Sequence, residues 1–78
     1  MAALVTYRVR LAWDEEGRAW NVEVPALPGC VTYGETQDEA LSNAREAIAG
    51  FLEVLRRHGE PIPPSDAEEA VTVEVPGA

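Results

Sequence analysis

The sequence VPALPGCV, residues 24–31, places two prolines, a glycine and the one cysteine of the 78-residue chain in a single short loop. Pro25 has no amide hydrogen to donate, so a strand that enters this loop ends there or continues only at a sheet edge. Pro28 and Gly29 suit the two central positions of a type II turn, the second of which requires a positive φ. The stretch therefore predicts a reversal between two strands, with the second strand starting at Cys30.

Upstream of this loop, apolar and polar residues alternate with the period of two that is typical of half-buried strands. Residues 5–13 form one such run and residues 20–24 form another. Residues 14–17 (DEEG) lie between them and have turn-forming chemistry, which predicts a β-hairpin. With that loop, the predicted register pairs Leu11 with Trp20, Val9 with Val22 and Tyr7 with Val24.

The two faces of this predicted hairpin differ in polarity. Trp13 and Trp20 fall on the apolar face, so we expect both rings in the core. The other face carries Arg8, Arg10 and Glu23, with Arg8 opposite Glu23 in the predicted register, where an opposite-charge pair is favourable. We expect this face to be polar enough for water, although its edge strands could pair between subunits.

Downstream of the loop, residues 30–33 can return as a third strand. Residues 36–39 (TQDE) have the form of a capping box, which predicts the start of a helix. The helix carries one continuous apolar stripe, formed by Ala40, Leu41, Ala44, Ala47, Ile48, Phe51, Leu52 and Leu55. Basic residues in its last turn and Gly59 as a C-terminal cap predict that it ends near His58.

Prolines at positions 61, 63 and 64 predict an extended connector after the helix, and residues 71–75 alternate again as a fourth strand. The order β-β-β-α-β predicts an α+β fold, an antiparallel three-strand meander with one helix on one face and a fourth strand beside strand one. A right-handed crossover carried by the helix would make that fourth strand parallel to the first. Residues 1–78 are expected to form one domain.

Fourteen acidic residues against six basic ones give the chain a net charge of -8. Such a charge repels phosphate backbones and attracts basic surfaces, so we expect a basic protein partner and no direct binding of nucleic acid. The same charge could instead serve only to keep the protein soluble. No apolar run approaches the ~20 residues of a membrane span, and the N-terminal sequence MAALVTYRVR lacks the features of a secretory signal. We therefore expect a cytoplasmic protein without membrane association.

Side chains that could do chemistry are few. One cysteine and one histidine allow neither an internal disulfide nor a cluster with metal-ligand spacing, so we expect no metal and no cofactor. Cys30 is expected in the core, apart from His58, which is expected to act as a cation at the helix end. The hairpin carboxylates Asp14, Glu15 and Glu16 could bind a divalent cation, but in a turn such groups are more often solvated. We predict a protein without catalytic residues, with a residual metal-dependent nuclease as the weaker alternative.

The succession of motifs along the chain resembles one family. Residues 25–30 (PALPGC), followed at this spacing by residues 34–40 (GETQDEA) and 61–63 (PIP), are similar to the HicB-like antitoxin family. The resemblance implies a partial RNase H-like fold that lacks the catalytic carboxylates of that fold. It also implies a partner, the HicA toxin, which is a small basic messenger-RNA-cleaving protein that the antitoxin covers.

The resemblance also bears on partner-binding residues, which we expect to be Asp14, Glu15, Glu16, Ala26, Leu27 and Pro28. Ala26 stands where the family commonly has an acidic residue, so any contact of that carboxylate is lost or moved. The sequence stops after its fourth predicted strand, without the C-terminal DNA-binding domain of many members, so we expect no operator binding by this chain alone. We expect a homodimer or higher homo-oligomer, because a thin layer has edges to cover. The alternative function is an orphan oligomeric module that binds a small ligand or an unrelated protein.

Overall fold

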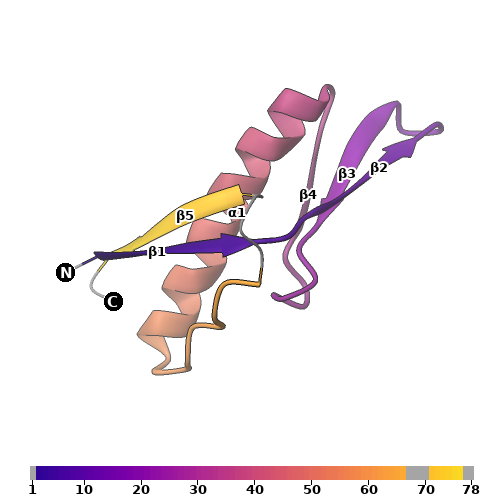
Figure 1. The fold of residues 1–78 in the computed structure, drawn as a ribbon. Coiled ribbons are helices and arrows are strands. Elements are labelled where there is room, and N and C mark those ends of the chain that lie inside the picture. Colours follow the sequence, from indigo (N-terminus) through magenta and orange to yellow (C-terminus); the bar gives the residue numbers. More distant parts are fainter. Residues whose placement is uncertain (1, 67–70, 77–78) are drawn as a thin grey trace.

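The structure, a computed structural model, describes residues 2–66 and 71–76 and has an α+β fold (Figure 1). Its elements are β1 (Ala2–Tyr7), β2 (Arg10–Asp14), β3 (Ala19–Glu23), β4 (Val31–Gly34), α1 (Gln37–Arg57) and β5 (Val71–Pro76). The antiparallel meander β2-β3-β4 forms one sheet, and β1 pairs with β5 in a second, two-stranded sheet. The predicted meander with one helix on one face and a last strand beside the first is confirmed.

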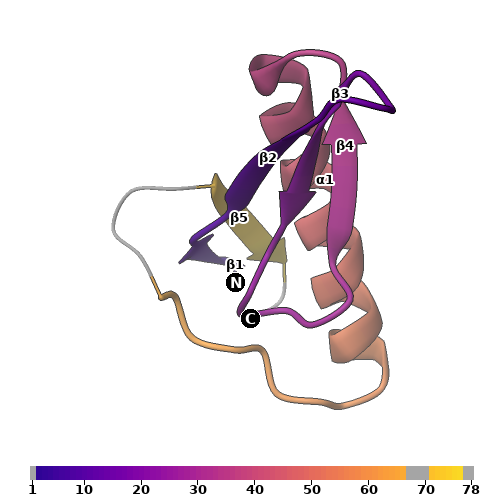
Figure 2. The ribbon, with the colours of Figure 1, turned by 90° about the vertical axis from the view of Figure 1, so that its right-hand side faces the viewer.

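The single helix α1 packs against strands of both sheets. Figure 2 shows α1 lying behind β2, β3 and β4, and Figure 1 shows the β1-β5 ribbon crossing the same helix farther along its length. The helix contacts β3, β4 and β5. Within residues 2–66 and 71–76, no helix is both long enough and apolar enough to cross a membrane.

The first predicted strand, residues 5–13, is divided between β1 and β2. Its predicted partner, β5, runs antiparallel to β1 instead of parallel. Strand pairing stops after Tyr7, where the amide of Arg8 donates to Oδ1 of Asp66 over 2.7 Å and the amide of Asp66 donates to the carbonyl of Thr6 over 3.1 Å. The connector after α1 therefore reaches β1 at its C-terminal end. Because β5 starts opposite Tyr7 and ends opposite Ala2, it runs antiparallel to β1, and the predicted parallel pairing is wrong.

The register of the hairpin also differs from the prediction. Leu11 faces Val22 instead of Trp20, and Arg10, instead of Arg8, faces Glu23. The loop lies one residue farther along the chain than predicted, at residues 15–18, because the carboxylate of Asp14 accepts from the amide of Glu16 over 3.1 Å and so caps the turn. Each residue of β2 therefore faces a partner in β3 that lies two positions farther along the chain than predicted. Because side chains alternate between faces with a period of two, every side chain keeps its predicted face.

Trp13 is not a core residue, which corrects the prediction that its ring lies in the core. Trp13 pairs with Trp20 at the end of the hairpin, with ring centroids 5.5 Å apart, and remains 43% exposed. Its indole nitrogen donates to the carboxylate of Glu15 over 2.7 Å. Figure 1 shows the tip of the β2-β3 hairpin projecting away from α1, which agrees with the exposure of Trp13.

The core lies between α1 and the sheet, and the predicted apolar stripe of the helix supplies four of the nine buried residues in the described part of the chain. Buried residues are Tyr7, Val22, Val24, Leu27, Cys30, Ala40, Ala44, Ile48 and Leu52. The alanines allow the helix to approach the sheet closely. The approach is closest at Gly34, where an added Cβ would fall on the backbone nitrogen of Ala40 and lie 2.7 Å from its Cα.

Both ends of α1 are capped close to where the sequence predicts. The hydroxyl of Thr36 accepts from the amide of Glu39 over 3.1 Å, while the Glu39 carboxylate accepts from the amide of Glu35 instead of that of Thr36. At the other end, the amide of Glu60 donates to the carbonyl of Leu55 over 2.9 Å, and Gly59 has a φ of 69°. This second pattern is a Schellman motif, which explains the glycine.

The core packing predicts opposite effects of one substitution at two glycines. Gly34→Ala should lower the free energy of unfolding by about 1–3 kcal/mol, because backbone atoms must move to admit the methyl group. Gly50→Ala is the matched control, since Gly50 lies in α1 with no atom within 4 Å of an added Cβ. It should raise stability by about 0.5–1 kcal/mol through helix propensity. Urea denaturation of both variants measures the difference, and equal effects would contradict the close approach at Gly34.

Tyr7 generates a prediction about pH. Its buried hydroxyl donates to the carbonyl of Pro63, and desolvation, followed by the nearby charge of Asp66, raises the pKa of Tyr7. The folded chain therefore holds this proton more tightly than the unfolded chain, whose tyrosines titrate near ~10. The contribution of Tyr7 to the free energy of unfolding is therefore fully present below the unfolded-state pKa, and it is lost as the pH rises through the higher folded-state pKa.

Tyr7→Phe should cost about 1 kcal/mol near neutral pH, because the hydrogen bond to Pro63 is lost. It should also flatten the decline in the free energy of unfolding as the pH rises above about 10. Tyr33→Phe is the matched control, because Tyr33 is 65% exposed. An unchanged alkaline slope in Tyr7→Phe would contradict the assigned role of this hydroxyl.

Candidate partner-binding surface

The loop that follows β3 is closed by its own backbone. The amide of Val24 donates to the carbonyl of Cys30 over 3.1 Å, and the amide of Leu27 donates back to the carbonyl of Val24 over 3.0 Å. The amide of Cys30 donates to the carbonyl of Leu27 over 2.9 Å, and Gly29 has a φ of 91°. These features agree with the type II turn predicted at Pro28 and Gly29. The loop is therefore a rigid feature of the surface.

The three loop residues predicted to bind a partner differ in exposure. Leu27 is fully buried and anchors the loop from inside, Ala26 is half-buried against the core, and Pro28 is exposed. Pro28 therefore presents the most surface to a partner. Contact of these residues with another protein stays a prediction.

The three hairpin carboxylates also have separate local roles. Asp14 is half-buried and caps the turn, Glu15 accepts from the indole of Trp13, and Glu16 is exposed. The tip precedes β3, whereas the loop at residues 24–30 follows it, so the two predicted groups lie at opposite ends of the sheet (Figure 1). The structure does not bring all six predicted residues together.

The structure adds a second acidic segment at the same end of the sheet as the hairpin tip. Trp20 of β3 faces Gly34 of β4, so the start of α1 lies at the same end of the sheet as the tip. Glu15, Glu16, Glu35, Asp38 and Glu39 belong to these two segments, and we call these residues the acidic end. Sequence reasoning missed the helix residues as part of a site, although the up-and-down order of a meander places them there.

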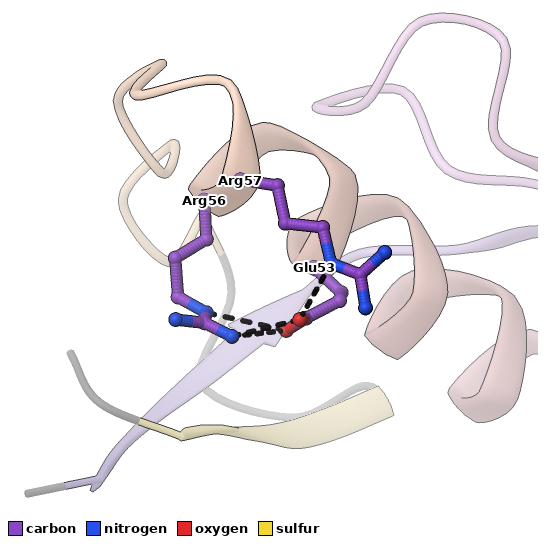
Figure 3. Close-up of polar contacts among 3 residues, drawn as sticks. All are labelled: Glu53, Arg56 and Arg57. Carbon is purple, nitrogen blue, oxygen red and sulfur yellow. Dashed lines mark hydrogen bonds and ion pairs between the residues drawn. The ribbon is translucent and has the colours of Figure 1, made fainter.

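The opposite end of α1 carries positive charge. Figure 3 shows Arg56 and Arg57 reaching the carboxylate of Glu53, over 2.7 Å and 3.2 Å at the nearest atoms. The hydrogen bond from Arg56, reinforced by its charge and by Arg57, holds the pKa of the Glu53 carboxyl below its usual range. The helix thus has acidic residues in its first turn and basic residues in its last turn, which both complement its dipole.

The cysteine and histidine have structural roles. Cys30 is 4% exposed, and burial raises the pKa of its thiol, which opposes formation of a nucleophilic thiolate. His58 is exposed and is the C-cap residue of α1. The prediction that Cys30 packs in the core is confirmed. Among the described residues, no group of three or more His, Cys, Asp and Glu side chains could hold a metal ion.

Comparison with known sequences identifies relatives over most of the chain. Residues 7–76 match the family described as HicB-like antitoxin of bacterial toxin-antitoxin system. A UPF0150 protein of Thermoplasma acidophilum is 51% identical over 63 residues, which cover 81% of this chain and 90% of that protein. Antitoxin HicB 2 of Photorhabdus laumondii is 31% identical over 78 residues, which cover 100% of this chain and 55% of that antitoxin.

Solved structures agree with these relatives. The crystal structure of the N-terminal domain of Burkholderia pseudomallei antitoxin HicB matches with a TM-score of 0.66 and 29% identity, covering 100% of this chain and 99% of that domain. The structure of the Burkholderia antitoxin itself matches with a TM-score of 0.70 and 30% identity, over 91% of this chain and 61% of that one. Since the family match spans residues 7–76 and the fold is that of a HicB N-terminal domain, this chain belongs to the HicB-like antitoxin family of bacterial toxin-antitoxin systems.

Proposed function

We propose that this protein binds a HicA-type messenger-RNA-cleaving toxin and neutralises it through protein–protein contact, in the cytoplasm where such a toxin acts. The observation that carries this proposal is the match of residues 7–76 to an antitoxin family. The N-terminal domain of HicB is also the part of the solved antitoxin that this chain resembles over its whole length. A toxin of this type is a small basic protein, so its chemistry complements a chain of net charge -8.

The acidic end is the surface where we place the toxin. It carries five carboxylates on two rigid segments, and Arg18 is the one basic residue in the hairpin loop. Charges gathered at one end produce a stronger local field than the same charges spread over the surface, and this field speeds association with a basic partner. The capped turn at Asp14 and the capped start of α1 hold both segments in position before binding. This limits the entropy lost on association.

We also propose that the chain acts by contact and not by catalysis. A residual nuclease would need carboxylates that converge on a divalent cation. Here the Asp14 carboxylate accepts from the amide of Glu16, and the Glu15 carboxylate accepts from Trp13. The inward face of the sheet is lined by buried apolar residues such as Val22. Cleavage of RNA by the purified chain that requires Mg²⁺ and is abolished by Asp14→Asn would overturn this part of the proposal.

The central prediction concerns complex formation. Co-expression with a HicA-like protein encoded beside this chain should yield a complex that co-purifies, and the complex should not cleave RNA that the toxin alone cleaves. A heat-unfolded sample of this chain is the control for nonspecific protection. If the folded chain forms no complex and the toxin keeps its activity, the alternative of an orphan binding module replaces the proposal.

A second prediction tests the acidic end. The double variant Glu16→Gln with Asp38→Asn removes two charges there, and we expect it to weaken toxin binding about tenfold at low salt, since ~1.4 kcal/mol is a factor of ten. The matched control, Glu46→Gln with Glu60→Gln, removes two exposed charges elsewhere and should leave binding near the wild-type value. Titration calorimetry at two salt concentrations measures both variants. Equal weakening by the two pairs would show that only net charge matters.

A further inference from the structure

The tip of the β2-β3 hairpin presents an aromatic ring that the chain itself covers only in part. Trp13 is 43% exposed, and its ring meets that of Trp20 at a centroid distance of 5.5 Å and an interplanar angle of 59°. Figure 1 shows this tip projecting away from α1. Tryptophan is enriched at the energetic centres of protein contacts, because one ring buries a large area. The exposed ring is therefore a candidate for contact with another molecule.

The ring of Trp13 is also held in place. Its indole nitrogen donates to Oε2 of Glu15 over 2.7 Å, and it contacts the half-buried ring of Trp20 on the neighbouring strand. Two contacts from different segments restrict rotation of the Trp13 side chain. A side chain that is fixed before binding loses little conformational entropy when a partner meets it.

The surroundings of this ring favour a positive charge. The face of an indole carries negative electrostatic potential, which attracts cations. Glu15 uses one carboxylate oxygen for the indole, and a carboxylate can accept several hydrogen bonds, so its Oε1 is available to a further donor. Glu15 and Glu16 are both exposed in this loop, whose one basic residue is Arg18. In the described part of the chain, no basic side chain forms a cation–π contact with Trp13.

We propose that the indole face of Trp13 and the carboxylate of Glu15 together bind one cationic side chain, an arginine or a lysine, of the basic protein partner. The guanidinium or ammonium group lies on the indole face, and its N–H groups donate to Oε1 of Glu15. This inference rests on the proposed function, because a toxin of the HicA type is the basic partner. The acidic end attracts that partner from a distance, whereas Trp13 and Glu15 anchor one of its side chains on contact.

Two other occupants suit this site less well. An apolar side chain would take water from the Glu15 carboxylate without replacing its hydrogen bonds, which costs free energy. A nucleobase could stack on the indole, but its phosphates would be repelled by Glu15 and Glu16 and by a chain of net charge -8. An arginine fits best, because its planar guanidinium stacks on aromatic faces and donates to carboxylates at the same time.

Variants of Trp13 test the anchor in the complex with a HicA-like protein encoded beside this chain. Trp13→Leu keeps an apolar side chain without an aromatic face, and it should raise the dissociation constant about tenfold, whereas Trp13→Phe should raise it less. Tyr33→Leu is the matched control, because Tyr33 is 65% exposed and lies on the other face of the sheet, and it should leave binding unchanged. Titration calorimetry measures the constants, and circular dichroism verifies that each variant folds. Wild-type affinity in Trp13→Leu, or an equal loss in Tyr33→Leu, would overturn the proposal.

A peptide titration tests the cation site without the toxin. Tri-arginine amide is added to the full chain, and the indole N–H signal of Trp13 in the NMR spectrum, assigned by its loss in Trp13→Phe, should shift as the peptide concentration rises. Tri-citrulline amide is the matched control, because citrulline has the shape of arginine without its charge, and it should leave the signal in place. Glu15→Gln should weaken the response to tri-arginine.

The outcomes separate this inference from the proposed function. An unchanged signal with tri-arginine, an equal shift with both peptides, or a larger shift with tetrauridylate would each overturn the cation site. If the chain responds to tri-arginine alone but binds no toxin, the proposed function fails and the cation site stands. If the toxin binds and Trp13→Leu has no effect, the proposed function stands and this inference fails.

Discussion

The close approach of α1 to the three-stranded sheet depends on the absence of a side chain at Gly34, which ends β4 against the backbone of Ala40. Because the chain turns into the helix within a few residues of this point, the contact sets how closely the first turns of the helix pack on the end of β4. Ala40 and Ala44 continue the close packing, and Ile48 and Leu52 fill the wider space beyond them. The contact holds the start of α1 at the end of the sheet where β4 finishes, which is also the end of the hairpin tip.

The second sheet depends on a different set of interactions. The β1-β5 ribbon is separated from the meander at Arg8 and Val9, and the connector after α1 is held at this break by Tyr7 and Asp66. Buried Tyr7 thus belongs both to the core and to the attachment of the connector. A chain of 78 residues has little apolar surface to bury, so a side chain with both roles contributes much to its stability.

The acidic end and the sheet face opposite α1 differ in physical character. The acidic end carries carboxylates at the tip of β2-β3 and at the start of α1, and long-range attraction to a basic protein suits it. The sheet face opposite α1 carries the opposite charges of Arg10 and Glu23 and the exposed side chains of Val31 and Tyr33, so short-range packing suits it. The two surfaces involve different residues, so contact at one leaves the other accessible.

Local chemistry made much of the fold predictable from the sequence. The helix bounds followed from Thr36 and Gly59, the loop turn from Pro28 and Gly29, and the inward and outward faces of the strands from their alternation. Each of these depends on residues that are neighbours along the chain. Family membership was also readable from the motif spacing, and it supplied the function that no single residue reveals. Two of the three predicted contact residues in the loop, Ala26 and Leu27, proved largely inward, because turn chemistry specifies a reversal but not which side chain points into the core.

Only the tertiary structure determined how segments that are far apart along the chain lie relative to one another. The direction of β5 depended on where the connector meets β1, and the break after Tyr7 depended on a carboxylate 58 residues away from Arg8. The exposure of Trp13 depended on how far the helix extends over the hairpin, and the assembly of the acidic end depended on the return of β4 beside the tip. Alternation specifies the face of a strand but neither its partner nor its neighbours in the next layer. Such contacts join residues whose separation along the chain carries no local signal, so they form only when the whole core packs.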